Sequence, residues 1–63
     1  MKLCKAKMAA ALARKDMKQK TLAEKAGVSR STINGVYCGR SCTPATAEAI
    51  AKALEMKLID LTE

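Results

Sequence analysis

QKTLAEKAGVSRSTINGV, residues 19–36, consists of two helix-forming runs with a glycine and a serine between them. We expect a helix over Gln19–Ala26, because its apolar residues fall on one face. Gly27 then supplies the left-handed residue with which many helices end. Ser29 is a favourable N-cap for a second helix over Arg30–Tyr37. The stretch therefore predicts two short helices joined by a tight turn.

The apolar residues of this stretch predict how the two helices cross. Ala23 is small at the expected crossing, and Leu22, Val28 and Ile33 supply the contacts that fix the angle. After Ile33, either Val36 or Tyr37 continues the inward face of the second helix. A second helix held out from the body in this way is the arrangement of a helix-turn-helix, which places that helix in the DNA major groove.

The rest of the chain also favours helix. A first helix is indicated by an apolar stripe and should end near Lys15–Asp16. Thr43 is placed to cap a later helix, with Pro44 at its first position, where a missing N–H costs nothing. The two apolar stripes are Cys4, Met8, Ala11 and Leu12, and Ala47, Ile50, Ala51 and Leu54.

A last short turn of helix, closing the core, is predicted near the end of the chain from Met56, Leu58, Ile59 and Leu61. The pattern shows no strand, linker or repeat. We therefore expect an all-α fold, a compact bundle of five short helices with a central helix-turn-helix. Residues 1–63 should form one domain, since a chain of this length forms a single small core.

The charge of the chain is uneven. The net charge is +6, but residues 1–40 carry ten of the twelve basic residues and two acidic ones, whereas residues 41–63 are slightly acidic. A basic lobe indicates a polyanionic partner. The alternative is that lysines keep an alanine-rich chain in solution.

The three cysteines do not indicate a metal site. Cys38 and Cys42 are four residues apart, but the chain has no histidine and only Cys4 besides, so a zinc site lacks ligands. We expect free thiols, no metal and no cofactor. No signal peptide and no run of about 20 apolar residues is present, so we expect a cytoplasmic protein without a membrane partner.

Several short motifs occur along the chain in an order that resembles the order found in one protein family. The run Q-x-x-L-A-x-x-x-G-V-S-x-x-x-I is similar to the helix-turn-helix of the lambdoid phage repressor and Cro family, also called the Xre family. Gly39 resembles the glycine of the loop that follows the second helix of this unit, and Pro44 the proline of the next helix. Ile50–Leu54 is similar to the family's I-A-x-A-L, and Leu61 to its closing leucine. The resemblance covers essentially the whole chain and implies a lambda-repressor-like DNA-binding domain.

The resemblance implies that Arg30, Ser31 and Asn34 read base edges. The side-chain chemistry fits, because Arg pairs with guanine O6 and N7 and Asn with adenine N6 and N7. The alternatives are a solvated Arg30 and an Asn34 that only weakens the helix end. Gly35 falls where relatives often carry a base-reading side chain. It allows either a close approach of backbone to DNA or an early end of the helix.

The resemblance also implies a set of contacts to DNA phosphates. Three departures from the family accompany it. Lys18 replaces a usual helix cap, Leu12 and Tyr37 stand where a salt bridge is frequent, and Glu55 stands where a helix-ending glycine is common. The expected phosphate contacts are Lys18, Gln19, Ser29, Arg40, Ser41 and Thr43.

The function expected from these features is a sequence-specific double-stranded DNA-binding transcriptional regulator of the repressor or Cro type, from a phage or mobile element. It should act in the bacterial cytoplasm or nucleoid. The alternatives are an antitoxin that also binds a toxin, and an enzyme, which would need a cleft and an acid–base pair that the chain lacks. No small-molecule substrate is expected. We expect a two-fold symmetric operator and a weak homodimer that forms on DNA through Lys57, Leu58 and Ile59.

Overall fold

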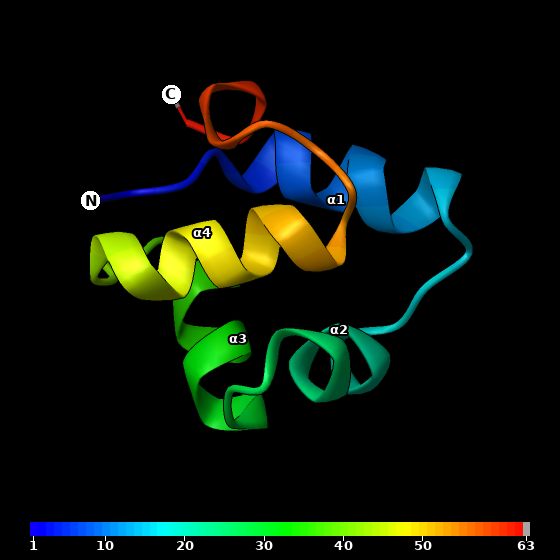
Figure 1. Cartoon of the computed structure of the whole chain (residues 1–63), viewed down its shortest axis with the longest axis horizontal. Coiled ribbons are helices and arrows are strands. Elements are labelled where there is room, and N and C mark those ends of the chain that lie inside the picture. Colours follow the sequence, from blue (N-terminus) through cyan, green and yellow to red (C-terminus); the bar gives the residue numbers. More distant parts are fainter. Residues whose placement is uncertain (63) are drawn as a thin grey trace.

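The computed structural model describes residues 1–62, which contain four α-helices and one 3-10 turn (Figure 1). The elements are α1 (Lys5–Arg14), α2 (Gln19–Ala26), α3 (Arg30–Tyr37), α4 (Pro44–Ala53) and the 3-10 turn η1 (Leu58–Asp60). Helix α2 packs against both α3 and α4, α1 contacts α3, and α4 contacts η1. In Figure 1, α2 and α3 lie at one end of the molecule and η1 lies at the other. Helices α2 and α3 are therefore well separated from η1.

One apolar core joins all four helices. Its side chains are alanine and branched or flexible aliphatic groups, and no polar or charged residue of the described chain is buried with them. Leu22, Ile33 and Leu54 are fully buried within it, and Val28 and Tyr37 pack at its margin. The buried core residues are Leu3, Met8, Ala11, Leu12, Leu22, Ala23, Ile33, Val36, Ala47, Ile50, Ala51, Leu54 and Leu61.

Two of the helices, α3 and α4, begin at a residue whose side chain caps the helix. The Ser29 hydroxyl accepts the Thr32 N–H at 3.1 Å and caps α3, and the Thr43 hydroxyl accepts the Thr46 N–H at 3.2 Å and caps α4. Both predicted caps are confirmed. By contrast, Lys18 precedes α2 without any side-chain cap. Helix α2 is therefore held by its packing rather than by its own first turn.

Left-handed residues follow the helices where the chain turns back. Gly27 and Gly39 have φ angles of 74° and 100° after α2 and α3. After α1 and α4 the same conformation is taken by Asp16 and Glu55, with φ angles of 50° and 56°. Glu55 therefore makes the bend for which a glycine is common, and it does so with a Cβ in an unfavourable region.

The prediction of a fifth helix is wrong, because the last element is a 3-10 turn. Leu58–Asp60 forms a single 3-10 turn, because Leu61 must return to the core and Thr62 pairs with Leu3 in an isolated antiparallel bridge. Only three residues are left for the turn, which is too few for an α-helix. Ile59 does not close the core either, because 73% of it is exposed. Within residues 1–62, no helix has the length and apolar content needed to cross a membrane.

Candidate nucleic-acid interface

Helix α3 has one buried face and one polar face. Ile33 and Val36 point into the core. Arg30, Ser31 and Asn34 are exposed, and their spacings of three and four residues place them on one side of the helix. The three predicted base-reading residues are thus brought together on the exposed face of α3.

A first hollow of about 320 Å³ lies between the starts of α2 and α3. It is lined by Gln19 together with Arg30, Ser31 and Asn34. Gln19 is half-buried at the start of α2, whereas the other three residues are exposed. The hollow therefore brings Gln19, a predicted phosphate contact, beside the three predicted base-reading residues.

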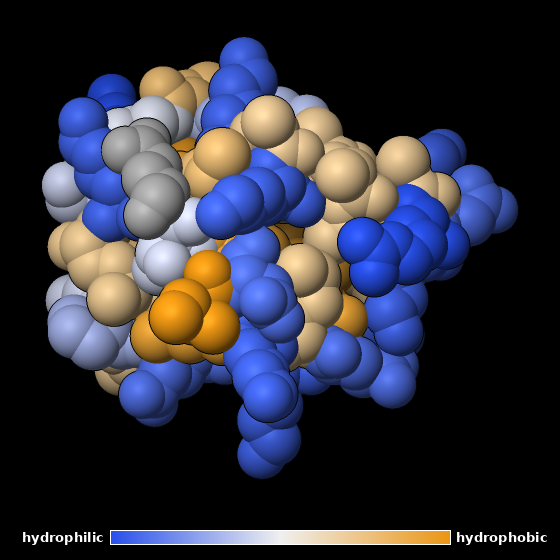
Figure 2. Space-filling model, turned by 90° about the horizontal axis from the view of Figure 1, so that it is seen from above, coloured by the Kyte–Doolittle hydropathy of each residue, from blue (hydrophilic) through white to orange (hydrophobic). Residues whose placement is uncertain are grey.

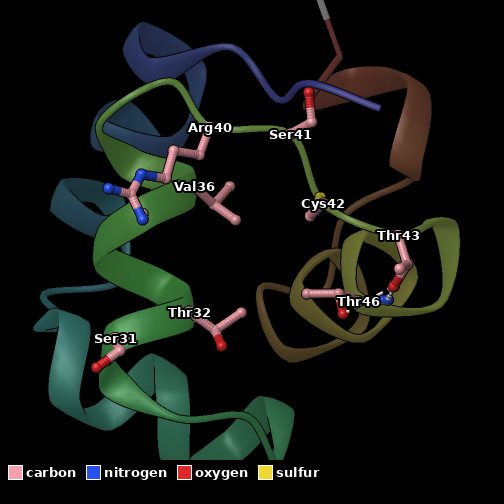
Figure 3. Close-up of a pocket in the computed structure, with 9 residues that line it drawn as sticks. Ser31, Thr32, Val36, Arg40, Ser41, Cys42, Thr43 and Thr46 are labelled. Carbon is pink, nitrogen blue, oxygen red and sulfur yellow. Dashed lines mark hydrogen bonds between the residues drawn. The ribbon is translucent and has the colours of Figure 1, made fainter.

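A second hollow of about 540 Å³ lies between α3 and the start of α4 (Figure 3). It is lined by hydroxyl groups and by one basic residue, Arg40, and no acidic side chain of the described residues lines either this hollow or the first one. Ser31 belongs to both hollows and lies on the ridge between them. The residues that line the second hollow are Ser31, Thr32, Gly35, Val36, Arg40, Ser41, Cys42, Thr43 and Thr46.

The capping hydroxyls are already engaged within the protein. Ser29 and Thr32 share a hydrogen bond of 2.8 Å between their hydroxyls, and Thr43 donates to the Thr46 hydroxyl at 3.0 Å. The Cys42 N–H donates to the Met1 carbonyl at 2.8 Å. These groups first serve to build the helix starts and the loop, which fixes the polar wall of the second hollow.

The profile of the Cro/C1-type HTH DNA-binding domain matches residues 7–63. The chain belongs to this family. It is therefore a DNA-binding regulator of the helix-turn-helix class, and the resemblance drawn from Gln19–Ile33 is confirmed.

Two solved structures are similar to this chain. The restriction-modification controller protein C.AhdI from Aeromonas hydrophila is 26% identical, with a TM-score of 0.82, over 89% of this chain and 86% of that one. A mutant of the restriction-modification controller protein C.Esp1396I is 28% identical, with a TM-score of 0.78, over 87% of this chain and 73% of that one. A search of the curated proteins found no match.

The remaining predicted phosphate contacts are spread along the helix-turn-helix and the loop before α4. Lys18 and Ser29 are exposed at the starts of α2 and α3 but line neither hollow. Arg40, Ser41 and Thr43 are exposed and line the second hollow. Together with Gln19, the predicted phosphate contacts therefore lie at the starts of α2 and α3 and in the loop between α3 and α4.

The predicted dimer residues lie at the start of η1 and directly before it, away from α3. Lys57 and Ile59 are exposed, whereas Leu58 is half-buried against the core. Figure 2 shows the face above α1 and η1, where a strongly apolar patch is surrounded by hydrophilic side chains. Met1 and Ile59 are the large apolar residues most exposed among those described. This face is separate from the one that carries the recognition helix (Figure 1).

Several residues of the second hollow were missed at the level of sequence. Thr32 and Thr46 each follow a helix cap by three residues, and this S-x-x-T and T-x-x-T spacing was the available signal. Gly35 stood out in the sequence by its missing side chain, but only the folded loop shows that Gly35 and Cys42 line the same hollow. The cysteines are free, and no group of metal-binding side chains is found within residues 1–62.

Proposed function

We propose that this protein is a sequence-specific regulator of transcription that inserts α3 into the major groove of a two-fold symmetric DNA site. The observation that carries the proposal is the exposed face of α3, where Arg30, Ser31 and Asn34 line one hollow and Ser31 also lines a second, and no acidic side chain within residues 1–62 lines either hollow. Arg30 reads guanine and Asn34 reads adenine, while Ser31 contacts the base or backbone between them.

Phosphate contacts on both sides of α3 hold the helix in the groove. Lys18, Gln19 and Ser29 contact the strand beside the start of α2, and Ser41 and Thr43 contact the strand beside α4. Such contacts supply affinity and register, whereas base contacts supply the choice of sequence. The uneven charge supports this division, because ten of the twelve basic residues lie in residues 1–40.

The protein pairs on DNA through the face that carries Lys57, Leu58 and Ile59. A single recognition helix covers few base pairs, so two copies on half-sites about 34–36 Å apart give a useful site. The exposed apolar area at Ile59 is small, which supports a dimer that is weak in free solution.

The regulatory setting is suggested by the two similar structures. Both are described as restriction-modification controller proteins, at 26% and 28% identity. We propose a controller of this kind, acting in the bacterial cytoplasm or nucleoid, with repression as the mode at an occupied promoter.

Selection of bound duplexes from a random pool, repeated at two salt concentrations, tests the proposal. A two-fold symmetric consensus with half-sites about 10–10.5 base pairs apart is expected. The consensus should persist at the higher salt while the affinity falls, because salt weakens phosphate contacts on every sequence. Binding without any consensus would reject the proposal and favour either non-specific binding or an antitoxin that mainly grips a protein.

A further inference from the structure

Gly35 lies on the exposed side of α3 but carries no side chain to read DNA. It follows Ser31 by four residues and adjoins Asn34, so a side chain there would stand among the recognition residues. The space over Gly35 is nevertheless occupied. A Cβ at position 35 would lie 3.3 Å from Cδ of Arg40 and 3.9 Å from its Cβ. The aliphatic stem of Arg40 therefore packs closely against the point from which a side chain of residue 35 would begin.

The backbone after α3 brings Arg40 to this place. Gly39 adopts a φ of 100°, the Gly39 N–H donates to the Val36 carbonyl at 3.1 Å, and the Arg40 N–H donates to the Gly35 carbonyl at 2.9 Å. These two hydrogen bonds form a Schellman motif, in which the second residue after the cap packs on the third residue before it. Here those two residues are Arg40 and Gly35. The contact is set by the helix end and not by a chance rotamer alone.

The direction of the Arg40 side chain decides what it can reach. Figure 3 shows it turned back across α3, with the guanidinium beside the helix and away from α4. When a recognition helix lies in the major groove, phosphates flank its sides and base edges face its middle. A guanidinium held against α3 on the side that also carries Ser31 is thus directed at bases (Figure 3), whereas one extended from the loop would reach a phosphate.

We propose that Arg40 is a specificity-determining residue that reads a guanine in place of the side chain absent at position 35, and that Gly35 is its positioning residue. The proposal rests on the proposed function and changes one part of it, since the sequence alone assigns Arg40 to a phosphate. It also explains why a glycine stands inside α3, because a Cβ at position 35 would crowd the Arg40 stem and require it to shift.

Arg40→Lys separates base reading from phosphate contact. Lysine keeps the positive charge but lacks the planar fork that pairs with guanine O6 and N7. We expect Arg40→Ala and Arg40→Lys both to lose about tenfold or more of the preference at one base pair of each half-site. Arg40→Lys should retain the salt dependence of the wild type. Full preference in Arg40→Lys, or an equal loss on all sequences in Arg40→Ala, would overturn the inference.

Gly35→Ala and Gly35→Val test the positioning role. We expect a graded loss of preference at the same base pair as in Arg40→Ala, larger for valine, and no further loss when either change is added to Arg40→Ala. This double-mutant comparison isolates the coupling between the two positions. A loss that persists in the Arg40→Ala background would show that residue 35 clashes with DNA by itself and would reject the positioning role. Thermal melting of each variant checks that the fold is retained.

The selection with wild-type protein separates this inference from the function on which it rests. If the wild type selects no consensus, the proposed function fails and this inference fails with it. If the wild type selects a consensus that Arg40→Ala leaves intact, only the role of Arg40 is rejected. Ser41→Ala is a matched control from the same hollow, and it should lower affinity without changing the preferred base.

Discussion

The Ser29 hydroxyl accepts the Thr32 N–H at 3.1 Å and lies 2.8 Å from the Thr32 hydroxyl. Two hydrogen bonds to Thr32 therefore hold the cap at the start of the recognition helix, α3. This cap lies at the end of α3 that also carries Arg30 and Ser31. The same side chain is proposed to contact a DNA phosphate. Its two roles can be separated by substitutions that change either the cap or the charge.

Ser29→Asp should keep the stability of the fold and weaken DNA binding. Aspartate caps a helix about as well as serine, so the free energy of unfolding should change by less than about 0.5 kcal/mol. A carboxylate near a phosphate should lower affinity for every sequence by about 1–4 kcal/mol. Urea unfolding and duplex binding measure the two effects. Ser29→Ala is the control and should lose about 1 kcal/mol of stability. Wild-type affinity in Ser29→Asp would remove Ser29 from the phosphate contacts.

Arg30→Ala should relax the preference at one base pair and cost about 1–3 kcal/mol on the selected site. The expected loss on random DNA is smaller, because a bidentate contact to guanine is sequence-dependent. Binding to the consensus and to single-base variants of it measures this. Arg14→Ala at the end of α1 removes the same charge on another helix and should leave the preference unchanged. An equal loss of affinity on all sequences would instead make Arg30 a phosphate contact.

Ile59→Lys should weaken pairing on DNA without unfolding the protein. Ile59 is 73% exposed, so its replacement removes little from the core. Full burial of such a side chain is worth about 1.5–3 kcal/mol, which sets the upper range of the lost cooperativity between two half-sites. Titration of duplexes with one and two half-sites measures it, and the single-site duplex is the control. A wild-type protein that is already a stable dimer at low micromolar concentration would contradict the weak-dimer proposal.

Asp16→Gly should stabilise the protein by about 0.5–1 kcal/mol. Asp16 holds a φ of 50°, and a left-handed residue with a Cβ is unfavourable by about 1–2 kcal/mol, part of which is offset by the greater freedom of glycine in the unfolded chain. Thermal or urea unfolding measures the gain. Gly39→Ala makes the reverse change, at a φ of 100°, and should destabilise by about 1 kcal/mol or more. A loss of stability in Asp16→Gly would show that the aspartate has a compensating contact.

The stability contributed by the ion pair between Lys15 and Glu55 should disappear in acid. The Lys15 ammonium lies 2.9 Å from Oε1 of Glu55, and this hydrogen bond and the positive charge lower the pKa of Glu55 below its ordinary value of 4.5. The contribution is therefore present above that value and is lost as the pH falls through the lowered pKa. Glu55→Gln should be less stable than the wild type at pH 7 and equal to it once Glu55 is protonated. Urea unfolding between these limits measures the difference, and a constant difference would contradict the pair as its source.

Much of the fold follows from local sequence. The bounds of α2 and α3, the caps Ser29 and Thr43 and the left-handed Gly27 are all set by residues within a few positions of one another. Such short-range signals can be read without knowledge of any tertiary contact, although the helices themselves depend on packing. The exposed positions of Arg30 and Asn34 follow equally from the spacing of the buried Ile33 and Val36.

Features that depend on contacts between distant parts of the chain were decided only by the tertiary structure. The end of the chain is a 3-10 turn and not a helix, since the return of Leu61 to the core limits its length. Glu55 is forced into a left-handed bend that its own preference opposes, because the core buries Leu54 just before it. The path of Arg40 over Gly35 needs the folded end of α3, where backbone hydrogen bonds reverse the chain. Sequence alone identified the helix proposed to read DNA, but only the fold showed that Arg40, outside that helix, packs against Gly35 within it.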